Sequence, residues 1–268
     1  VTLSRDFQRG HTLRELVEAE GAEPDLLAAF WPFGEERLYL HQERAFEAGR
    51  AGRPFVITTG TGSGKTEAFL LPVLDGILRR KREGVRGLQA VFVYPMNALA
   101  NDQLERLRRL LRGSGMDISF ALYTGDSDAA SLSLREKPAE TERTTRAEVR
   151  RNPPDILLTN YKQLDFLLVR HEDRALFTKS LKYIVLDELH SYRGALATEI
   201  ACLLRRLRAQ ADLEPGGLVE IGTSATVAGG EDGGGALADF AAILFGRTIE
   251  QGDIIGEALA ADSSRGDT

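Results

Sequence analysis

Cysteine is almost absent from this sequence: Cys202 is the only one among 268 residues, so the chain cannot form an internal disulfide. It stands in an apolar helical pattern, which favours a small core residue over a reactive thiol. No apolar run approaches the ~20 residues that a membrane span requires. The first residues also lack the basic-then-apolar pattern of a secretory signal. We therefore expect a cytoplasmic protein with no membrane partner.

Basic residues are in the minority, and the formal net charge is −6. Because proteins bind nucleic acids largely by neutralising phosphates, this balance alone argues mildly against a nucleic-acid partner. Arginine runs at 106–109 and 205–208 are expected to be solvated helix faces. Hydrophobic residues make up 43% of the chain and charged residues 28%, which is typical of a globular domain with one full core.

Glycine, by contrast, is plentiful, and three glycines stand in one short segment between an apolar run and a helical pattern. The segment comprises Thr59, Gly60, Thr61, Gly62, Ser63, Gly64, Lys65 and Thr66. Its glycines allow the backbone N–H groups to point inward at a phosphate, and the following helix dipole strengthens the same anion site. Lys65 is expected to reach the β- and γ-phosphate oxygens, and Thr66 to offer its hydroxyl to Mg²⁺. Thr59 replaces the glycine that usually opens this pattern. The segment predicts a phosphate-binding loop for a nucleoside triphosphate.

A second motif, which is acidic, supports the prediction of a nucleotide site. The apolar run 183–186 predicts a buried parallel strand, and it ends in Asp187-Glu188-Leu189-His190. Ligands of open α/β sheets sit at the carboxyl ends of the strands. We expect Asp187 to hold Mg²⁺, and Glu188 to orient or deprotonate the attacking water.

Apolar strand patterns alternate with amphipathic helix patterns along most of the chain. Strands are expected at 55–58, 90–94, 118–123, 156–159, 183–186 and 218–223. Helices are expected at 67–82, 97–112, 161–170 and 195–210, with Asn97 as a helix cap. This alternation predicts an α/β fold, with helices on both faces of a parallel sheet. Together with the phosphate loop, it predicts a RecA-like P-loop NTPase lobe.

The order of the motifs resembles that of the superfamily 2 helicases of the DExH type. The resemblance implies that Gln42, in Leu-Tyr-Leu-His-Gln, reads adenine and that the nucleotide is ATP. It implies that His190 acts with Asp187 and Glu188 and links them to the motif that couples hydrolysis to nucleic acid. That coupling motif is Thr223-Ser224-Ala225-Thr226, in which Ser224, Ala225 and Thr226 are the expected coupling residues.

Three further motifs match segments that hold nucleic acid in this superfamily. They are Tyr94-Pro95-Met96-Asn97-Ala98-Leu99-Ala100-Asn101-Asp102-Gln103, Tyr123-Thr124-Gly125-Asp126 and Leu157-Leu158-Thr159-Asn160-Tyr161. The resemblance implies that the residues contacting one strand are Pro95, Asn97, Gln103, Thr124, Gly125, Thr159 and Asn160. Short polar side chains and backbone amides suit this task, since they contact phosphates without reading bases and need little net charge.

Finer features, such as Asp187-Glu188-Leu189-His190-Ser191-Tyr192-Arg193-Gly194, resemble the MrfA/YprA-like bacterial DNA helicases. That group includes helicases of DNA repair and of phage-defence systems such as DISARM and Druantia. The resemblance implies single-stranded DNA as the partner, in preference to RNA.

The chain is expected to divide into an N-terminal helical extension (1–38), a RecA-like lobe (39–255) and a linker (256–268). A polar insertion is expected at 126–154, with a short helix at 144–151, and another flexible loop at 229–235. Helicases of this superfamily need a second RecA-like lobe with an arginine finger, in the same full-length chain or a partner chain. No such second set of motifs follows 226, so this chain alone should be only weakly active. Two alternatives remain: a polypeptide-translocating SecA-like ATPase, and a regulatory lobe that binds ATP without motor activity.

Overall fold

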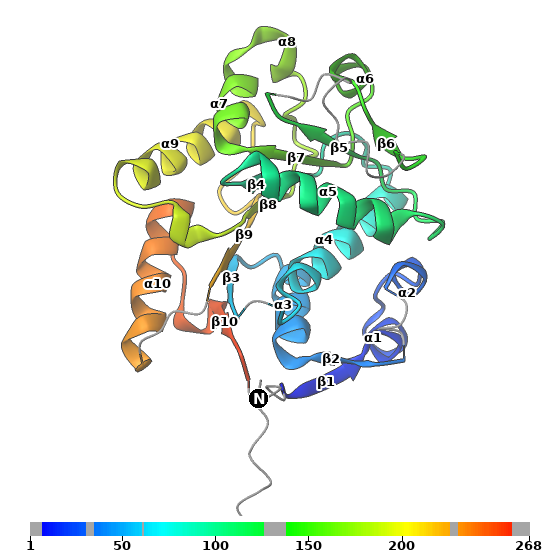
Figure 1. Cartoon of the computed structure of the whole chain (residues 1–268), viewed down its shortest axis with the longest axis vertical. Helices are drawn as coiled ribbons and strands as arrows, with labels where there is room; N and C mark the ends of the chain where they lie inside the picture. The colour runs from blue at the N-terminus through cyan, green and yellow to red at the C-terminus, as the bar shows by residue number, and fades with distance from the viewer. Residues whose placement is uncertain (1–6, 31–34, 61, 126–137, 226–229, 259–268) are drawn as a thin grey trace, which may run out of the picture.

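The computed structural model describes residues 7–30, 35–60, 62–125, 138–225 and 230–258. Its centre is an eight-stranded parallel sheet with the strand order β10-β3-β9-β8-β4-β7-β5-β6 (Figure 1). The strands are β3 (Phe55–Thr58), β4 (Ala90–Tyr94), β5 (Phe120–Tyr123), β6 (Glu142–Arg143), β7 (Ile156–Asn160), β8 (Tyr183–Leu186), β9 (Val219–Ser224) and β10 (Ile254–Gly256). All six predicted strands are confirmed, while β6 and β10 were not predicted.

Helices cover both faces of this sheet. They are α3 (Leu40–Arg50), α4 (Lys65–Arg82), α5 (Asn97–Leu111), α6 (Arg146–Arg151), α7 (Tyr161–Val169), α8 (His171–Arg174), α9 (Ala195–Gln210) and α10 (Gly230–Phe245), with the 3-10 turns η1 (Leu189–Ser191) and η2 (Gln251–Asp253). Successive strand side chains point to opposite faces, so Phe55 and Ile57 pack under α3, α4 and α5, while Val56 faces the core under α7, α9 and α10 (Figure 1). The predicted three-layer RecA-like architecture is therefore confirmed.

The N-terminal part packs beside α3 and α4 and contains strands as well as helices. It comprises β1 (Arg9–Thr12), α1 (Leu13–Glu20), α2 (Asp25–Ala29) and β2 (Arg37–Tyr39), with β1 and β2 antiparallel. Fully buried Asp75 of α4 accepts a hydrogen bond of 2.8 Å from the Glu23 amide, which ties this part to the lobe. The extension predicted as helical is thus mixed.

One loop prediction and one helix-cap prediction were wrong. Residues 230–235 open α10 instead of forming a loop, because the later part of this helix buries Leu237, Ala241 and Leu244 against the sheet. This burial outweighs the poor helix propensity of its glycines. Asn97 is the first residue of α5 and not its cap, which is Met96.

None of the helices in the described ranges is long and apolar enough to cross a bilayer.

Cys202 is exposed, contrary to the prediction of a core residue. The buried stripe of α9 runs through Ile200, Leu204 and Leu207, and Cys202 lies on another side of the helix.

The predicted polar insertion is only partly peripheral. Residues 126–137 lie outside the described part, but β6 pairs with β5, and α6 follows it with Thr145 as its cap. Glu142 of β6 and Arg108 of α5 form a bidentate ion pair at 2.7 and 2.8 Å, and both side chains are only 2% exposed. The second half of the insertion is therefore anchored in the lobe.

Candidate nucleotide and nucleic-acid site

The predicted site residues collect at one edge of the sheet. Because all eight strands are parallel, their carboxyl ends meet there, and the loops that follow β3, β4, β5, β7, β8 and β9 carry the motifs. The strand register pairs Thr58 with Ser224, and Tyr94 with Asn160. Motifs far apart in sequence therefore become neighbours.

The predicted phosphate-binding loop joins β3 to α4, so the predicted strand–loop–helix arrangement is confirmed. Gly64 has the left-handed φ of 78° and directly precedes Lys65, the first residue of α4. The Lys65 ammonium donates to the Thr59 carbonyl at 2.9 Å. Ser63 Oγ lies 2.6 Å from Oγ1 of the fully buried Thr59, so a threonine fits where glycine is usual. Gly60 and Gly62 lie in the loop, Thr66 is the second residue of α4, and Thr61 lies outside the described residues.

Three side chains from outside the loop contact it. Gln42 donates to the Gly64 carbonyl at 3.2 Å, and its own Oε1 accepts from the Tyr39 amide at 2.9 Å. His41 Nε2 lies 2.9 Å from the Ser63 carbonyl, and burial lowers the pKa of this imidazole, which favours its neutral form as the donor. A carboxylate oxygen of Glu257, just after β10, accepts from the Gly60 amide. Adenine recognition by Gln42 stays a prediction, while His41 and Glu257 were not assigned from the sequence.

Asp187 at the end of β8 is held by a residue that the sequence reasoning did not assign. The Thr223 hydroxyl of β9 donates to Asp187 Oδ1, and the Thr223 hydroxyl oxygen in turn accepts from the Glu188 amide at 3.1 Å. Burial raises the pKa of Asp187, and the Thr223 hydrogen bond and the Lys65 ammonium counteract that rise. Thr223 begins the recognised Thr-Ser-Ala-Thr segment, and that segment was the only signal for it in the sequence.

Glu188 adopts an unusual backbone conformation for a non-glycine residue, with φ 55°. Its Oε2 is buried and has no hydrogen-bond donor among the described residues. His190 Nδ1 lies 3.2 Å away, within ion-pair distance but without hydrogen-bond alignment. A strained residue that presents an unoccupied carboxylate oxygen is suited to bind and orient a water molecule.

The oxygens at this edge also fit Mg²⁺. Thr66 and Asp187 supply the hydroxyl and carboxylate that a hard cation prefers. No cluster of three or more His, Cys, Asp or Glu suited to a metal was found in the described ranges. A sparse protein contribution is expected for Mg²⁺, which keeps waters and binds substrate phosphates.

His190 approaches the predicted coupling motif at one point. Its Nδ1 lies 3.5 Å from the Ala225 amide, at the limit of a hydrogen bond. Ser224 is buried at the end of β9, and no hydrogen bond to His190 is found in the described part of the chain. Thr226 lies outside the described residues, so the predicted link through it stays a prediction.

Two predicted nucleic-acid motifs contact each other directly. Asn160 donates to Asn97 Oδ1 at 2.6 Å, and its own Oδ1 caps α7 by accepting from the Gln163 amide at 2.8 Å. The side chain of Asn160 thus links the end of β7 to the start of α5.

Thr159 is fully buried, and its hydroxyl donates to the Tyr123 carbonyl at 2.6 Å. Thr159 therefore supports the end of β5, and its side chain does not face solvent. Thr124 is buried, while Gly125 is exposed with open space around it. Pro95 and Gln103 are half-buried. Among the described residues, the Gln103 side chain forms no hydrogen bond with the other residues predicted to contact nucleic acid. Direct contacts to nucleic acid stay predictions.

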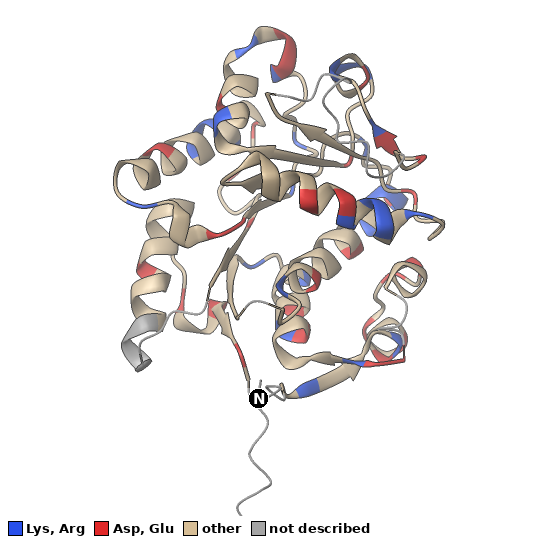
Figure 2. Cartoon of the chain, in the orientation of Figure 1, with Lys and Arg blue, Asp and Glu red and all other residues tan. Residues whose placement is uncertain are grey.

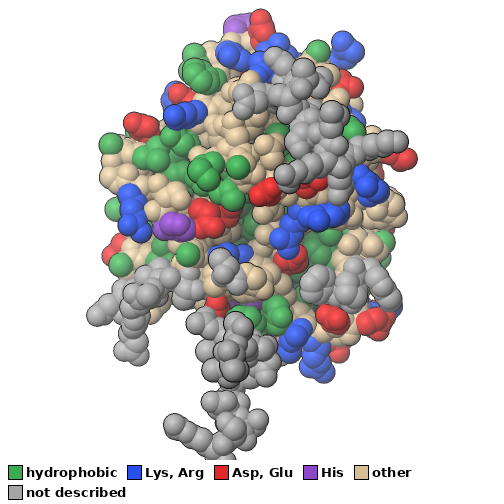
Figure 3. All heavy atoms as spheres, viewed as in Figure 1, with side chains coloured by type: hydrophobic (Ala, Val, Ile, Leu, Met, Phe, Trp, Pro, Cys, Tyr) green, Lys and Arg blue, Asp and Glu red, His purple; other side chains and the backbone are tan. Residues whose placement is uncertain are grey.

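Charge around this edge is mixed. Lys and Arg are interspersed with Asp and Glu over most helices (Figure 2), and both signs lie beside one another on the face in Figure 3. On the face seen in Figure 3, the basic side chains do not form one continuous patch.

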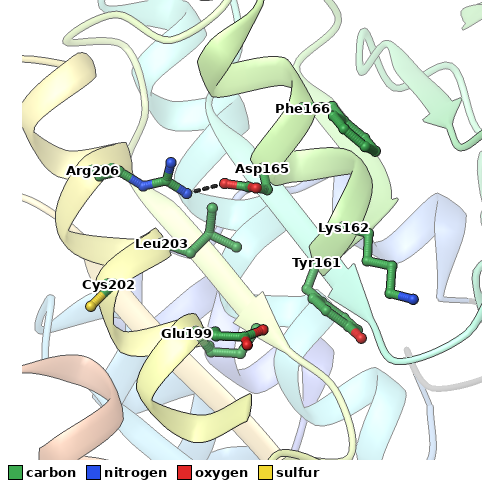
Figure 4. A pocket seen from close by; sticks show the side chains of 9 residues that line it. Tyr161, Lys162, Asp165, Phe166, Glu199, Cys202, Leu203 and Arg206 are labelled. Atoms are coloured by element: carbon green, nitrogen blue, oxygen red, sulfur yellow. Dashed lines mark hydrogen bonds and ion pairs between the residues drawn. The ribbon is translucent and has the colours of Figure 1, made fainter. Parts of the chain in front are cut away.

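A separate groove of about 400 Å³ lies between α7 and α9 (Figure 4). Asp165 and Arg206 form an ion pair across it, and Cys202 lies on its α9 side. It begins at Tyr161, directly after Asn160, and it contains none of the predicted nucleotide-binding residues.

The fold and this edge define the class of protein: a RecA-like lobe with the glycine-rich loop after β3 and the acidic motif after β8 at one edge of the sheet. The family model described as DEAD/DEAH box helicase matches residues 39–231. The chain is 30% identical to Druantia protein DruE of Escherichia coli over 74% of this chain and 16% of that protein. It is 34% identical to the uncharacterized ATP-dependent helicase YprA of Bacillus subtilis over 78% of this chain and 25% of that protein.

The structure also matches a crystal structure of the DUF1998 helicase MrfA bound to DNA and AMPPNP. The TM-score is 0.69 at 30% identity, over 92% of this chain and 30% of that one. This chain belongs to the DEAD/DEAH box helicase family, as the sequence motifs predicted. It spans less than a third of each of these three relatives.

Proposed function

We propose that this chain is the first RecA-like lobe of an ATP-dependent DNA helicase or translocase, working in a reducing cytoplasm. One observation carries the proposal: Thr223 joins Asp187 and Glu188 opposite the loop that contains Lys65. Binding alone would not require Lys65, a half-buried Asp187 and a strained Glu188 whose Oε2 lacks a hydrogen-bond donor in one place.

In the proposed mechanism, the loop amides and the Lys65 ammonium hold the β- and γ-phosphates of ATP. Mg²⁺, when bound by Thr66 and Asp187, neutralises charge on those phosphates. Glu188 Oε2 accepts a hydrogen bond from water and orients it for in-line attack on the γ-phosphate. His190 lies close to both Glu188 and the Ala225 amide, so a change in the contacts of Glu188 can alter the hydrogen bond between His190 and Ala225.

For the nucleic acid, we propose that the segments around Asn97, Gly125 and Asn160 bind phosphates of single-stranded DNA. The Asn97–Asn160 hydrogen bond supports this proposal, because it fixes the start of α5 relative to the end of β7. Relatives named as helicases, and the MrfA complex with DNA and AMPPNP, favour DNA and ATP. We also propose that a second RecA-like lobe supplies an arginine finger, worth roughly 10³–10⁵ in rate in other nucleotidases.

Steady-state ATPase activity of the full-length protein tests this function. It is measured without polymer, with single-stranded DNA and with single-stranded RNA, and Glu188→Gln serves as the blank. Stimulation by DNA that is lost in the Glu188→Gln protein is the expected result.

Stimulation by RNA alone would overturn DNA as the substrate. Turnover indifferent to both polymers would favour the polypeptide-translocating alternative. Nucleotide binding without any turnover would favour a regulatory lobe.

A further inference from the structure

The loop after β5 is held by an arginine from the insertion. Arg146, the first residue of α6, donates to the Thr124 carbonyl at 3.2 Å and to the Gly125 carbonyl at 3.1 Å. Its guanidinium also lies over the Tyr123 ring, 5.4 Å from the ring centroid. One side chain therefore contacts all three residues of this turn.

The helix that carries Arg146 is itself fixed. Arg150, one turn later, donates to buried Asp173 of α8 at 2.7 Å, and the Tyr123 hydroxyl donates to the same carboxylate oxygen at 3.3 Å. The neighbouring Glu172 pairs with Arg150 at 2.9 Å. Since α6 is bound to α8 and β5, Arg146 has a defined position relative to the loop.

Three consecutive carbonyls are thus engaged by protein donors. Thr159 holds the carbonyl of Tyr123, and Arg146 holds those of Thr124 and Gly125. Peptide groups are rigid, so fixing three carbonyls also fixes the directions of the N–H groups between them. The exposed side of Gly125 has open space, as a backbone that approaches a phosphate needs.

We infer that Arg146 is a positioning residue for nucleic acid: it shapes the Thr124–Gly125 turn so that this backbone receives a phosphate of the bound strand. The inference rests on the proposed nucleic-acid function. It gives the second half of the insertion a role in gripping the strand. One guanidinium nitrogen, Nη2, donates to both carbonyls while the planar group lies over the Tyr123 ring, and a lysine ammonium has no such planar face.

The test measures binding of fluorescently labelled oligothymidylate to the full-length protein at several salt concentrations. Arg146→Lys keeps the charge but loses the planar group that spans the two carbonyls and the Tyr123 ring, and we expect affinity to fall about tenfold. Arg151→Lys is the matched control: it lies on the same helix, is exposed, and has no recorded hydrogen bond or ion pair among the described residues. Its affinity should stay within about twofold.

The salt dependence separates positioning from direct contact. Loss of a direct arginine–phosphate contact in Arg146→Ala would lower the slope of log affinity against log salt by about one. A positioning role predicts weaker binding with an unchanged slope. Combining Arg146→Lys with Thr159→Val should cost less than the sum of the two single effects, because both hold the same turn.

AMPPNP binding with Mg²⁺ reports whether each variant is intact, and it should be unchanged in Arg146→Lys. Wild-type affinity in that variant, or equal losses in Arg146→Lys and Arg151→Lys, would overturn the inference. A slope reduced by one in Arg146→Ala would also overturn it. If the wild-type protein itself bound no oligothymidylate, the proposed function would fail first, and that result is distinct from any of these.

Discussion

Glu142→Ala is expected to destabilise the chain by about 3–5 kcal/mol, because it removes the carboxylate that forms two hydrogen bonds with a buried guanidinium. Arg108 and Glu142 are each only 2% exposed, and two hydrogen bonds of 2.7 and 2.8 Å join them. The carboxylate also accepts from the Ala139 amide at 3.1 Å. Glu105 lies 3.6 Å from Arg108 and can replace only part of this interaction.

The free energy of unfolding from urea denaturation measures this effect. Replacing both partners, in Arg108→Met with Glu142→Leu, should cost less than Glu142→Ala, since no charge is left buried. Asp165→Ala breaks an exposed ion pair with Arg206 and should cost at most about 1 kcal/mol. If Glu142→Ala cost no more than Asp165→Ala, the insertion would not be anchored as described.

Three further predictions concern the nucleotide site. Gly64→Ala should destabilise the lobe by about 1–3 kcal/mol more than Gly62→Ala in urea. Both glycines have positive φ, but only a Cβ at Gly64 would lie 2.4 Å from Gln42 Nε2; equal losses would exclude this contact. The pKa of Asp187 is raised by burial, so its ionisation costs stability as pH rises above the unfolded value. Asp187→Asn should therefore raise the Tm of the nucleotide-free protein at neutral pH. At a pH low enough to protonate Asp187, the substitution should not raise the Tm, and a lower Tm at neutral pH would contradict the reasoning. Thr223→Val removes the hydroxyl shared by Asp187 and the Glu188 amide, and kcat should fall about tenfold with AMPPNP affinity unchanged; an unchanged kcat would refute the role of Thr223.

The fold and the nucleotide loop were predictable because their signals are local. Phe55-Val56-Ile57, the glycines after it and the helical pattern from Glu67 lie within one short stretch, and the structure forms that strand, loop and helix. The acidic motif after β8 was predictable for the same reason.

Contacts between distant segments were not predictable from one sequence. Nothing near Arg146 or Glu257 marks the loops that they contact, since those loops lie 21 and 197 residues away along the chain. Thr159 illustrates the other limit, because its motif was recognised but its hydroxyl points to a carbonyl inside the protein. The helix α10 was missed because its stability comes from burial and not from its glycine-rich start.

The central claim is that the nucleotide site and the strand-binding loops form one coupled unit. The most direct test is the affinity of the full-length protein for single-stranded DNA with and without AMPPNP and Mg²⁺. We predict that the nucleotide changes this affinity by about 5–150-fold, the usual range of coupling between two sites. The same DNA affinity in both conditions would contradict the claim.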